Sequence, residues 1–266
     1  MKTVQLRDRQ RIEAILRRNP RLHLYELGDL DDFFWPDTNW YVLDVREPTA
    51  VALLYTAPAL PVLVGLAEPP RDELNELLRK LTPQLPSHVY AHLSDGAIET
   101  LAQRFQARSH GVHFRMALTD PAWLTGQDSA GIVQLSPADL PEVRTFYEAA
   151  YPGNWFEPRM LETGCHFGIR LPGRDGSDSS QLVSIAGVHV YSATYRVAAL
   201  GNVATLPEFR GQGLASGACA RLCWHLLETT EHIGLNVRHD NASAIACYQK
   251  LGFSRVAVFE EFDLVS

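Results

Sequence analysis

The stretch Val203-Ala-Thr-Leu-Pro-Glu-Phe-Arg-Gly-Gln-Gly-Leu-Ala215 joins a short apolar strand, ended by a proline, to an amphipathic helix. An apolar residue recurs at every fourth position from Leu214 to Leu226. A helix start leaves its first N–H groups unpaired and carries partial positive charge, so it attracts phosphate. Because Gly211 and Gly213 lack Cβ atoms and Arg210 adds a cation, the stretch predicts a turn that binds a pyrophosphate.

Two well-known phosphate-binding motifs do not fit this turn. A Walker A loop needs Lys and Ser or Thr after its last glycine, where Leu214 and Ala215 stand. A dinucleotide fingerprint needs a third glycine, where Ser216 stands, and a turn directly after the strand. The pattern Arg210-x-x-Gly213-x-Ala215 instead resembles the acyl-coenzyme A signature of the GNAT superfamily of N-acyltransferases.

A second motif lies downstream at the distance expected for that superfamily. Leu235-Asn-Val-Arg-His-Asp-Asn241, followed by Ala244, Tyr248 and Leu251-Gly252-Phe253, resembles its next strand and helix. The resemblance implies a GNAT-like α/β fold with a mixed sheet, acetyl-coenzyme A as cosubstrate, and no metal. It implies the following contacts with the coenzyme: Val203, Ala204, Thr205, Arg210, Gly211, Gln212, Gly213, Leu214, Ala215, Asn241 and Tyr248.

Amine attack on a thioester requires a free lone pair and a protonated leaving sulfur. A tyrosine, with a pKa near ~10, stays protonated and can serve as the acid. Tyr248 follows Asn241 by seven residues, or about two helical turns, so the two share one helix face. The resemblance implies that Asn241 contacts the pantetheine arm and Tyr248 protonates the thiolate, with the backbone of Val203 and Thr205 pairing with the pantetheine amides. A pure N-cap and an ordinary packed aromatic are the structural alternatives.

The general base stays open at this point. Members of the superfamily often carry a glutamate about four residues before the valine of the motif strand, but Ala198 and Ala199 occupy this neighbourhood. His189, in the preceding strand, is the best substitute because an imidazole titrates near ~6.5. A histidine simply bonded within the sheet is the alternative. His239 and a water relay are two further candidates.

The element pattern predicts two domains, a catalytic domain over residues 130–266 and a degenerate copy over residues 1–120. The expected strands of the second half are 132–135, 166–171, 182–191, 197–205, 235–238 and 255–264, with helices after Ser136, Gly213 and Asn241 and a hairpin tip over 173–180. The expected elements of the first half are strands 40–45, 50–55, 62–66, 88–93 and 113–118, helices 72–81 and 98–106, and an N-terminal amphipathic helix from Val4 to Leu16.

The first half lacks the glycine turn of the second. The junction before its helix reads Glu68-Pro-Pro-Arg-Asp-Glu73, which puts prolines and carboxylates where phosphates would lie. This pattern predicts a copy that binds no coenzyme and packs against the active half. An unrelated α/β domain is the alternative.

Composition favours a cytoplasmic protein. The net charge of -7 argues against nucleic acid as a partner, and no apolar run is long enough to span a membrane. Four cysteines without metal-ligand spacing suit small apolar fillers in a reducing compartment: Cys165, Cys219, Cys223 and Cys247. A homodimer is left open.

The acceptor is expected to be an amine of a small molecule or peptide. The segment around the end of the first helix of the second half is rich in aromatic side chains and suits an amine with apolar bulk: Tyr147, Tyr151, Trp155, Phe156 and Glu162. The alternative is that these aromatics anchor the loop to the core. The sequence thus predicts an N-acetyltransferase that works by direct transfer in a ternary complex. A non-catalytic acyl-coenzyme A-binding or interaction module on the same fold is the alternative.

Overall fold

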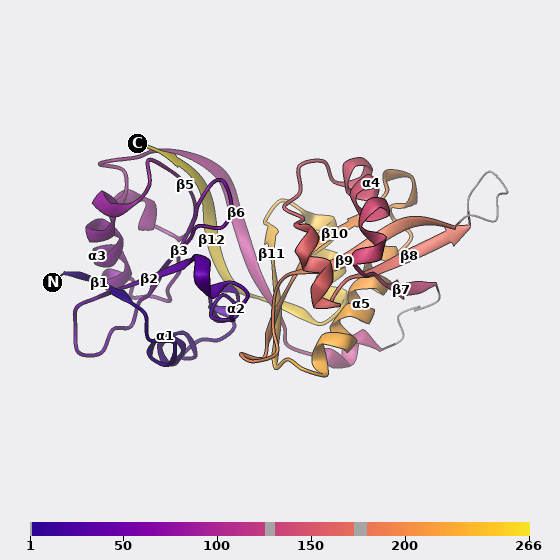
Figure 1. The fold of residues 1–266 in the computed structure, drawn as a ribbon, viewed down its shortest axis with the longest axis horizontal. Coiled ribbons are helices and arrows are strands. Elements are labelled where there is room, and N and C mark those ends of the chain that lie inside the picture. The colour runs from indigo at the N-terminus through magenta and orange to yellow at the C-terminus, as the bar shows by residue number, and fades with distance from the viewer. Residues whose placement is uncertain (1, 126–130, 173–179) are drawn as a thin grey trace. The chain divides into compact units, whose positions relative to one another are not determined.

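The computed structural model describes residues 2–125, 131–172 and 180–266 (Figure 1). The chain divides into two compact units. The first comprises Met1–Met116, Val237–Asn241 and Arg255–Ser266, and the second comprises Ala117–Asn236 and Ala242–Ser254. In the described parts of the chain, no helix combines the length and the apolar character that crossing a membrane requires.

The first unit is built on a mixed sheet. Its strands lie in the order β1 (Thr3–Leu6), β2 (Thr38–Leu43), β3 (Ala52–Tyr55), β4 (Val62–Gly65), β5 (His88–Ser94), β12 (Phe253–Val265) and β6 (Gln106–Leu118). Neighbours from β1 to β4 are antiparallel, β4 and β5 are parallel, and β5 pairs antiparallel with β12. Its helices are α1 (Arg9–Leu16), α2 (Leu24–Gly28) and α3 (Asp72–Leu81).

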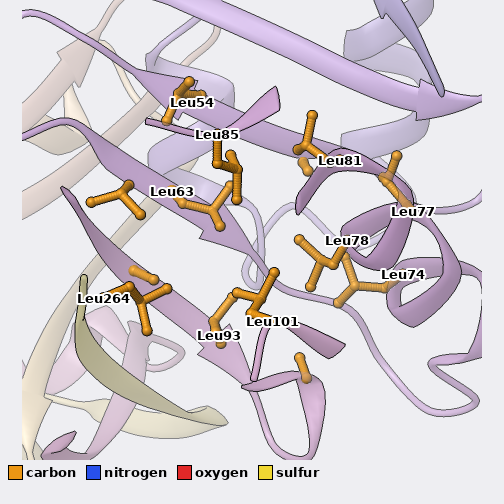
Figure 2. Packing of buried hydrophobic residues seen from close by; sticks show 14 of the residues in the cluster. Leu54, Leu63, Leu74, Leu77, Leu78, Leu81, Leu85, Leu93, Leu101 and Leu264 are labelled. Carbon is orange, nitrogen blue, oxygen red and sulfur yellow. The ribbon is translucent and has the colours of Figure 1, made fainter. Parts of the chain in front are cut away.

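Helix α3 packs on this sheet through a leucine face. Leu74, Leu77, Leu78 and Leu81 recur at helical spacing and are fully buried. Figure 2 shows these side chains gathered with leucines of the strands, among them Leu63 and Leu93. Each fully buried leucine stabilises the fold by roughly 1.5–3 kcal/mol, so this cluster carries much of the first unit's stability.

The second unit repeats the same plan. Its sheet order is β11 (His232–Arg238), β10 (Val197–Thr205), β9 (Ser180–Ser192), β8 (Phe167–Pro172) and β7 (Ile132–Gln134). Only β10 and β11 run parallel within this set, joined by α5 (Leu214–Leu227). Two further helices are α4 (Leu140–Ala150), whose start is preceded by a Ser136–Asp139 capping box, and α6 (Ala242–Lys250).

The expected α/β fold with a mixed sheet is confirmed, and so are the first five elements of the expected repeat β-β-β-α-β-α-β. The order β-β-β-α-β occurs as β2-β3-β4-α3-β5 and again as β8-β9-β10-α5-β11. In both copies a helix connects the pair of parallel strands. The expected hairpin tip over 173–180 lies, but for its last residue, outside the described residues.

Two local predictions in the first half are wrong. The expected helix 98–106 is only a 3₁₀ turn, Ala97–Thr100, before β6 begins at Gln106. Leu101 and Phe105 gave the helical spacing, but both are buried in the leucine cluster from an irregular segment. The N-terminal helix starts only at Arg9, because the Asp8 side chain accepts a hydrogen bond from the Arg11 N–H and residues before it pair with β2.

The compact units also differ from the expected division at the C-terminus. Residues 255–266, expected in the second domain, belong to the first unit. The reason is that Phe259–Val265 form an antiparallel ladder with β5. Each unit is therefore made of segments that are not continuous in sequence.

Candidate active site

The glycine turn opens α5 as a bare helix start. Gly213 is the N-cap in the left-handed conformation, at φ 78°, and Gly211 has φ 77°. The first helical hydrogen bond runs from the Gly217 N–H to the Gly213 carbonyl at 3.1 Å. Among the described residues, no side-chain cap hydrogen bond is made to the first amides of the helix, and its first turn holds no acidic residue. A Cβ built at either glycine would meet no atom within 4 Å, so the turn is open to close approach by an anion.

Arg210 holds this turn in place. Its Nε donates to the Thr205 carbonyl and its Nη2 to the Ala150 carbonyl, both at 3.1 Å. The guanidinium therefore ties the end of β10 and the end of α4 to the glycine turn. Both acceptors are backbone carbonyls, so these bonds do not neutralise the positive charge of Arg210, which lies next to the bare amides.

Strand β10 is irregular where the pantetheine arm is expected. Its ladder with β9 shifts between Gly201 and Ala204, and Asn202 adopts a positive φ of 54°. The Tyr147 hydroxyl donates to the Asn202 carbonyl at 2.7 Å, which fixes the bulge from α4. Bulges of this kind redirect backbone groups out of a ladder, and left-handed non-glycine residues are concentrated at functional sites.

Two of the expected coenzyme residues follow this bulge. Val203 and Thr205 are half-buried, whereas Ala204 between them is buried. The Ser184 hydroxyl donates to the Ala204 carbonyl at 3.2 Å. It also lies 2.9 Å from the Thr205 hydroxyl. The strand is thus held from the β9 side at its last residues.

Helix α6 lies beside the start of α5. Cys247 Sγ and Ser216 Oγ are 3.1 Å apart, and Ser216 belongs to the first turn of α5. The next residue, Tyr248, is buried, with its ring centroid 5.9 Å from that of Phe253. The structure therefore brings the tyrosine-bearing helix next to the glycine turn within the second unit.

Asn241 directly precedes α6, as expected of an N-cap position. It is exposed, and its backbone N–H donates to the Arg238 carbonyl at 3.1 Å. By its contacts it groups with the first unit, whereas Tyr248 groups with the second.

His189 lies on β9 against a glycine that leaves room for its ring. Gly187 on β9 and Gly201 on β10 are directly opposite in the antiparallel ladder. A Cβ at Gly201 would lie 1.9 Å from the His189 ring. Only glycine at this position admits the imidazole, which is half-buried on the sheet.

A second imidazole, His166, lies over the other glycine and was missed by sequence reasoning. A Cβ at Gly187 would lie 2.3 Å from the His166 ring. His166 is fully buried, and its ring centroid is 6.1 Å from that of Phe156. Burial and the charge of His189 lower the pKa of His166 to about 4, so it is neutral near pH 7. The signal in the sequence was the pair of strand glycines, whose register it does not reveal.

The other residues expected near the acceptor divide into buried and exposed groups. Tyr147 is buried, and burial raises the pKa of its hydroxyl, which therefore stays protonated. Tyr151, Trp155 and Glu162 are exposed. His239 is also exposed, and its Nδ1 lies 3.0 Å from the Val112 carbonyl in the first unit.

Solved structures with the same fold cover almost the whole chain. A Drosophila protein of 14% identity aligns over 99% of this chain and 98% of its own, with a TM-score of 0.71. A tandem GNAT protein from the clavulanic acid biosynthesis pathway, 15% identical, aligns over 99% and 98% with a TM-score of 0.59. An acetyltransferase of the GNAT family from Novosphingobium aromaticivorans, 22% identical, aligns over 81% and 88% with a TM-score of 0.56. At these identities the likeness establishes the fold.

The second unit is also similar in sequence to a known family. Residues 132–253 match the model of the acetyltransferase (GNAT) family. This part of the chain is thus similar in sequence to the GNAT acetyltransferases, and the whole chain has a fold similar to that of tandem GNAT proteins. No curated protein matches the chain in the corresponding sequence comparison.

Proposed function

We propose that this protein is an N-acetyltransferase that transfers the acetyl group of acetyl-coenzyme A to an amine in a ternary complex. The observation that carries the proposal is the bare start of α5, where two left-handed glycines and an uncapped helix N-terminus lie beside Arg210. This arrangement suits a pyrophosphate, because amides and a cation lie together at a helix whose first turn holds no acidic residue.

The residues around this turn suit the remaining steps. The pyrophosphate would be held by the amides from Gly211 to Ala215, including those of Gln212 and Leu214. The backbone of Val203 and Thr205 would pair with the pantetheine arm, and Asn241 would contact it from the start of α6. Tyr248 would donate its proton to the leaving thiolate, because a phenol remains protonated at neutral pH.

His189 is our proposed base. It is half-buried, one strand from the bulge at Asn202, and it carries an imidazole in a unit that lacks a carboxylate on β10 before Thr205. As the amine attacks, one proton would pass from the amine nitrogen to the imidazole and a second from Tyr248 to the sulfur. Both transfers balance without a covalent acyl-enzyme intermediate.

We propose that the first unit binds no coenzyme. Helix α3 begins with Asp72 and Glu73, in contrast to the acid-free start of α5. Glu73 accepts hydrogen bonds from the Thr49 and Ala50 backbone amides, so this carboxylate is held at the helix start. A fixed negative charge there repels a pyrophosphate.

We also assign the protein to the cytoplasm. All four cysteines are free thiols: Cys165, Cys219, Cys223 and Cys247. Burial raises the pKa of each, which suits unreactive packing residues in a reducing compartment.

Thiol release from acetyl-coenzyme A in the presence of a panel of amines tests the proposal. We expect turnover with at least one class among small primary amines, polyamines, amino acids and peptide N-termini. Tight binding of coenzyme A without release of thiol for any class of amine would favour the second candidate, the non-catalytic module. The lack of a carboxylate on β10 is the observation that favours this candidate.

A further inference from the structure

His166 is an unusual group for a protein interior. Both of its ring nitrogens are buried and make no hydrogen bond with the described residues. A buried polar atom without a partner costs about 1–3 kcal/mol, and such atoms in a folded protein call for an explanation. Phenylalanine would fill a similar volume among Phe156 and the sheet at no such cost. The imidazole therefore stabilises the fold less than phenylalanine would, which points to a role other than packing.

The register of the sheet places this group next to His189. Gly187 and Gly201 are directly opposite each other, so their missing Cβ atoms point to the same face. Positions related in this way lie about 4.5–5.5 Å apart at Cβ. His166 occupies the first of them and His189 the second, so the two rings are neighbours on one face.

We propose that His166 is a positioning residue for His189, with its free ring nitrogen accepting a hydrogen bond from the His189 imidazolium that forms during catalysis. The inference rests on the proposed role of His189 as base. The amine N–H bond breaks, its proton joins one nitrogen of His189, and the N–H on the other nitrogen donates to His166. The pair has then gained one proton and one positive charge, and the proton returns to solvent through half-buried His189.

Neutral surroundings make His166 suitable as an acceptor. Besides burial, the charge of His189 is the cause of its lowered pKa, so a proton on His189 keeps His166 unprotonated. Tyr147 from α4, whose ring packs on Phe156, stays protonated, and burial raises the pKa of Cys165, the residue before His166, to about 11. In the segment between α4 and β8, Glu157 and Arg159 form an ion pair at 2.7 Å. In catalytic triads a carboxylate supports the imidazolium, and His166 would do so as a neutral group.

The test measures the pKa of His189 by NMR titration in the full chain, without acetyl-coenzyme A. His166→Phe keeps the ring volume but removes the acceptor, and we expect it to lower the pKa of His189 by about one, since a hydrogen bond to a charged group is lost. His166→Asn and His166→Gln each offer an oxygen near one ring-nitrogen position, and at least one should restore the wild-type value. Cys165→Ala, which disturbs the same packing but neither ring, should leave it unchanged.

Kinetics separate this inference from the proposed function. In His166→Phe, we expect the rising limb of the pH profile of kcat/KM to move down by the same amount, with kcat reduced and the KM for acetyl-coenzyme A unchanged. An unchanged pKa of His189 in folded His166→Phe would overturn the inference. If His166→Phe lowers the pKa of His189 but His189→Ala keeps normal turnover, His189 is not the base. That result would also overturn the catalytic role of the pair.

Discussion

The helices α3 and α5 occupy the same place in the two halves but begin in opposite ways. Both connect a pair of parallel strands. Helix α5 starts at a left-handed glycine with no acid in its first turn, whereas α3 starts after Pro69-Pro70 with Asp72 and Glu73. A shared topology therefore provides the helix start, and only the residues of the turn decide whether an anion is attracted there.

The strongest test of the two-unit account removes one unit. The fragment 130–266 lacks β5, the antiparallel partner of Phe259–Val265. It would expose Phe262 and Leu264, which are buried in the full chain, so we expect an insoluble or inactive product. Solubility and thiol release of the fragment, measured beside the full chain, check this. A fully active fragment would defeat the account.

The helix that follows each parallel pair offers a second contrast. Tyr248 lies in α6, whereas the matching segment of the first unit is the short turn Ala97–Thr100 without a tyrosine. We expect Tyr248→Phe to reduce kcat by roughly 100-fold, the scale of a lost general acid, with the affinity for coenzyme A unchanged. Tyr191→Phe, which removes a hydroxyl bonded to Thr229 on the same unit, is the matched control. An unchanged kcat would make Tyr248 a packing residue.

The second unit should lose stability in acid through a buried histidine. The pKa of His166 is lowered from 6.5 to about 4, so the unfolded chain binds more protons between these values. The second unit should therefore lose about 3 kcal/mol of stability as the pH falls through this window. In the first unit burial raises the pKa of Glu26, but Arg115 and other partners outweigh it and bring it to about 2, so this contribution is lost only below about 4.5. Burial also lowers the pKa of His92 in β5, so the first unit too loses some stability as the pH falls below 6.5.

Hydrogen exchange of the backbone amides measures this loss of stability in the second unit. We expect amides of β8 and β9 to lose protection between pH 6.5 and 4, and the effect to disappear in His166→Phe. An unchanged pH dependence of these amides in His166→Phe would remove His166 as its origin.

The smallest expected effect concerns the acid at the start of α3. Glu73→Gln weakens the hydrogen bonds to the Thr49 and Ala50 amides, and we expect a loss of about 1 kcal/mol in the free energy of unfolding. Chemical denaturation measures it. The variant should still bind no coenzyme in its first unit, because the prolines before α3 and Asp72 remain.

The sequence predicted what local patterns determine. The helix from Leu214, the strand 197–205 and the helix start after Ser136 follow from residues close in the chain, and the structure confirms all three. The repeated β-β-β-α-β order was predicted for the same reason. The helix 98–106 failed because buried side chains of an irregular segment can match a helical spacing.

Contacts between residues far apart in the chain could not be predicted from the sequence. Arg210 donates to Ala150, sixty residues earlier in the chain, so its role as a clamp needs the tertiary structure. The neighbouring positions of His166 and His189 depend on which glycines face each other in the ladder. The assignment of the last strand to the first unit depends likewise on its pairing with β5.

Calorimetric titration with coenzyme A tests the central claim most directly. The account predicts one site per chain, an affinity loss of about 100-fold or more in Gly213→Val from the loss of at least two hydrogen bonds to phosphate, and wild-type binding in Gly96→Val. Gly96 is the matched control, because it has the same φ of 78° and equally open space in the first unit. Two sites per chain, or wild-type affinity in Gly213→Val, would contradict the claim that the glycine turn of α5 alone binds the pyrophosphate.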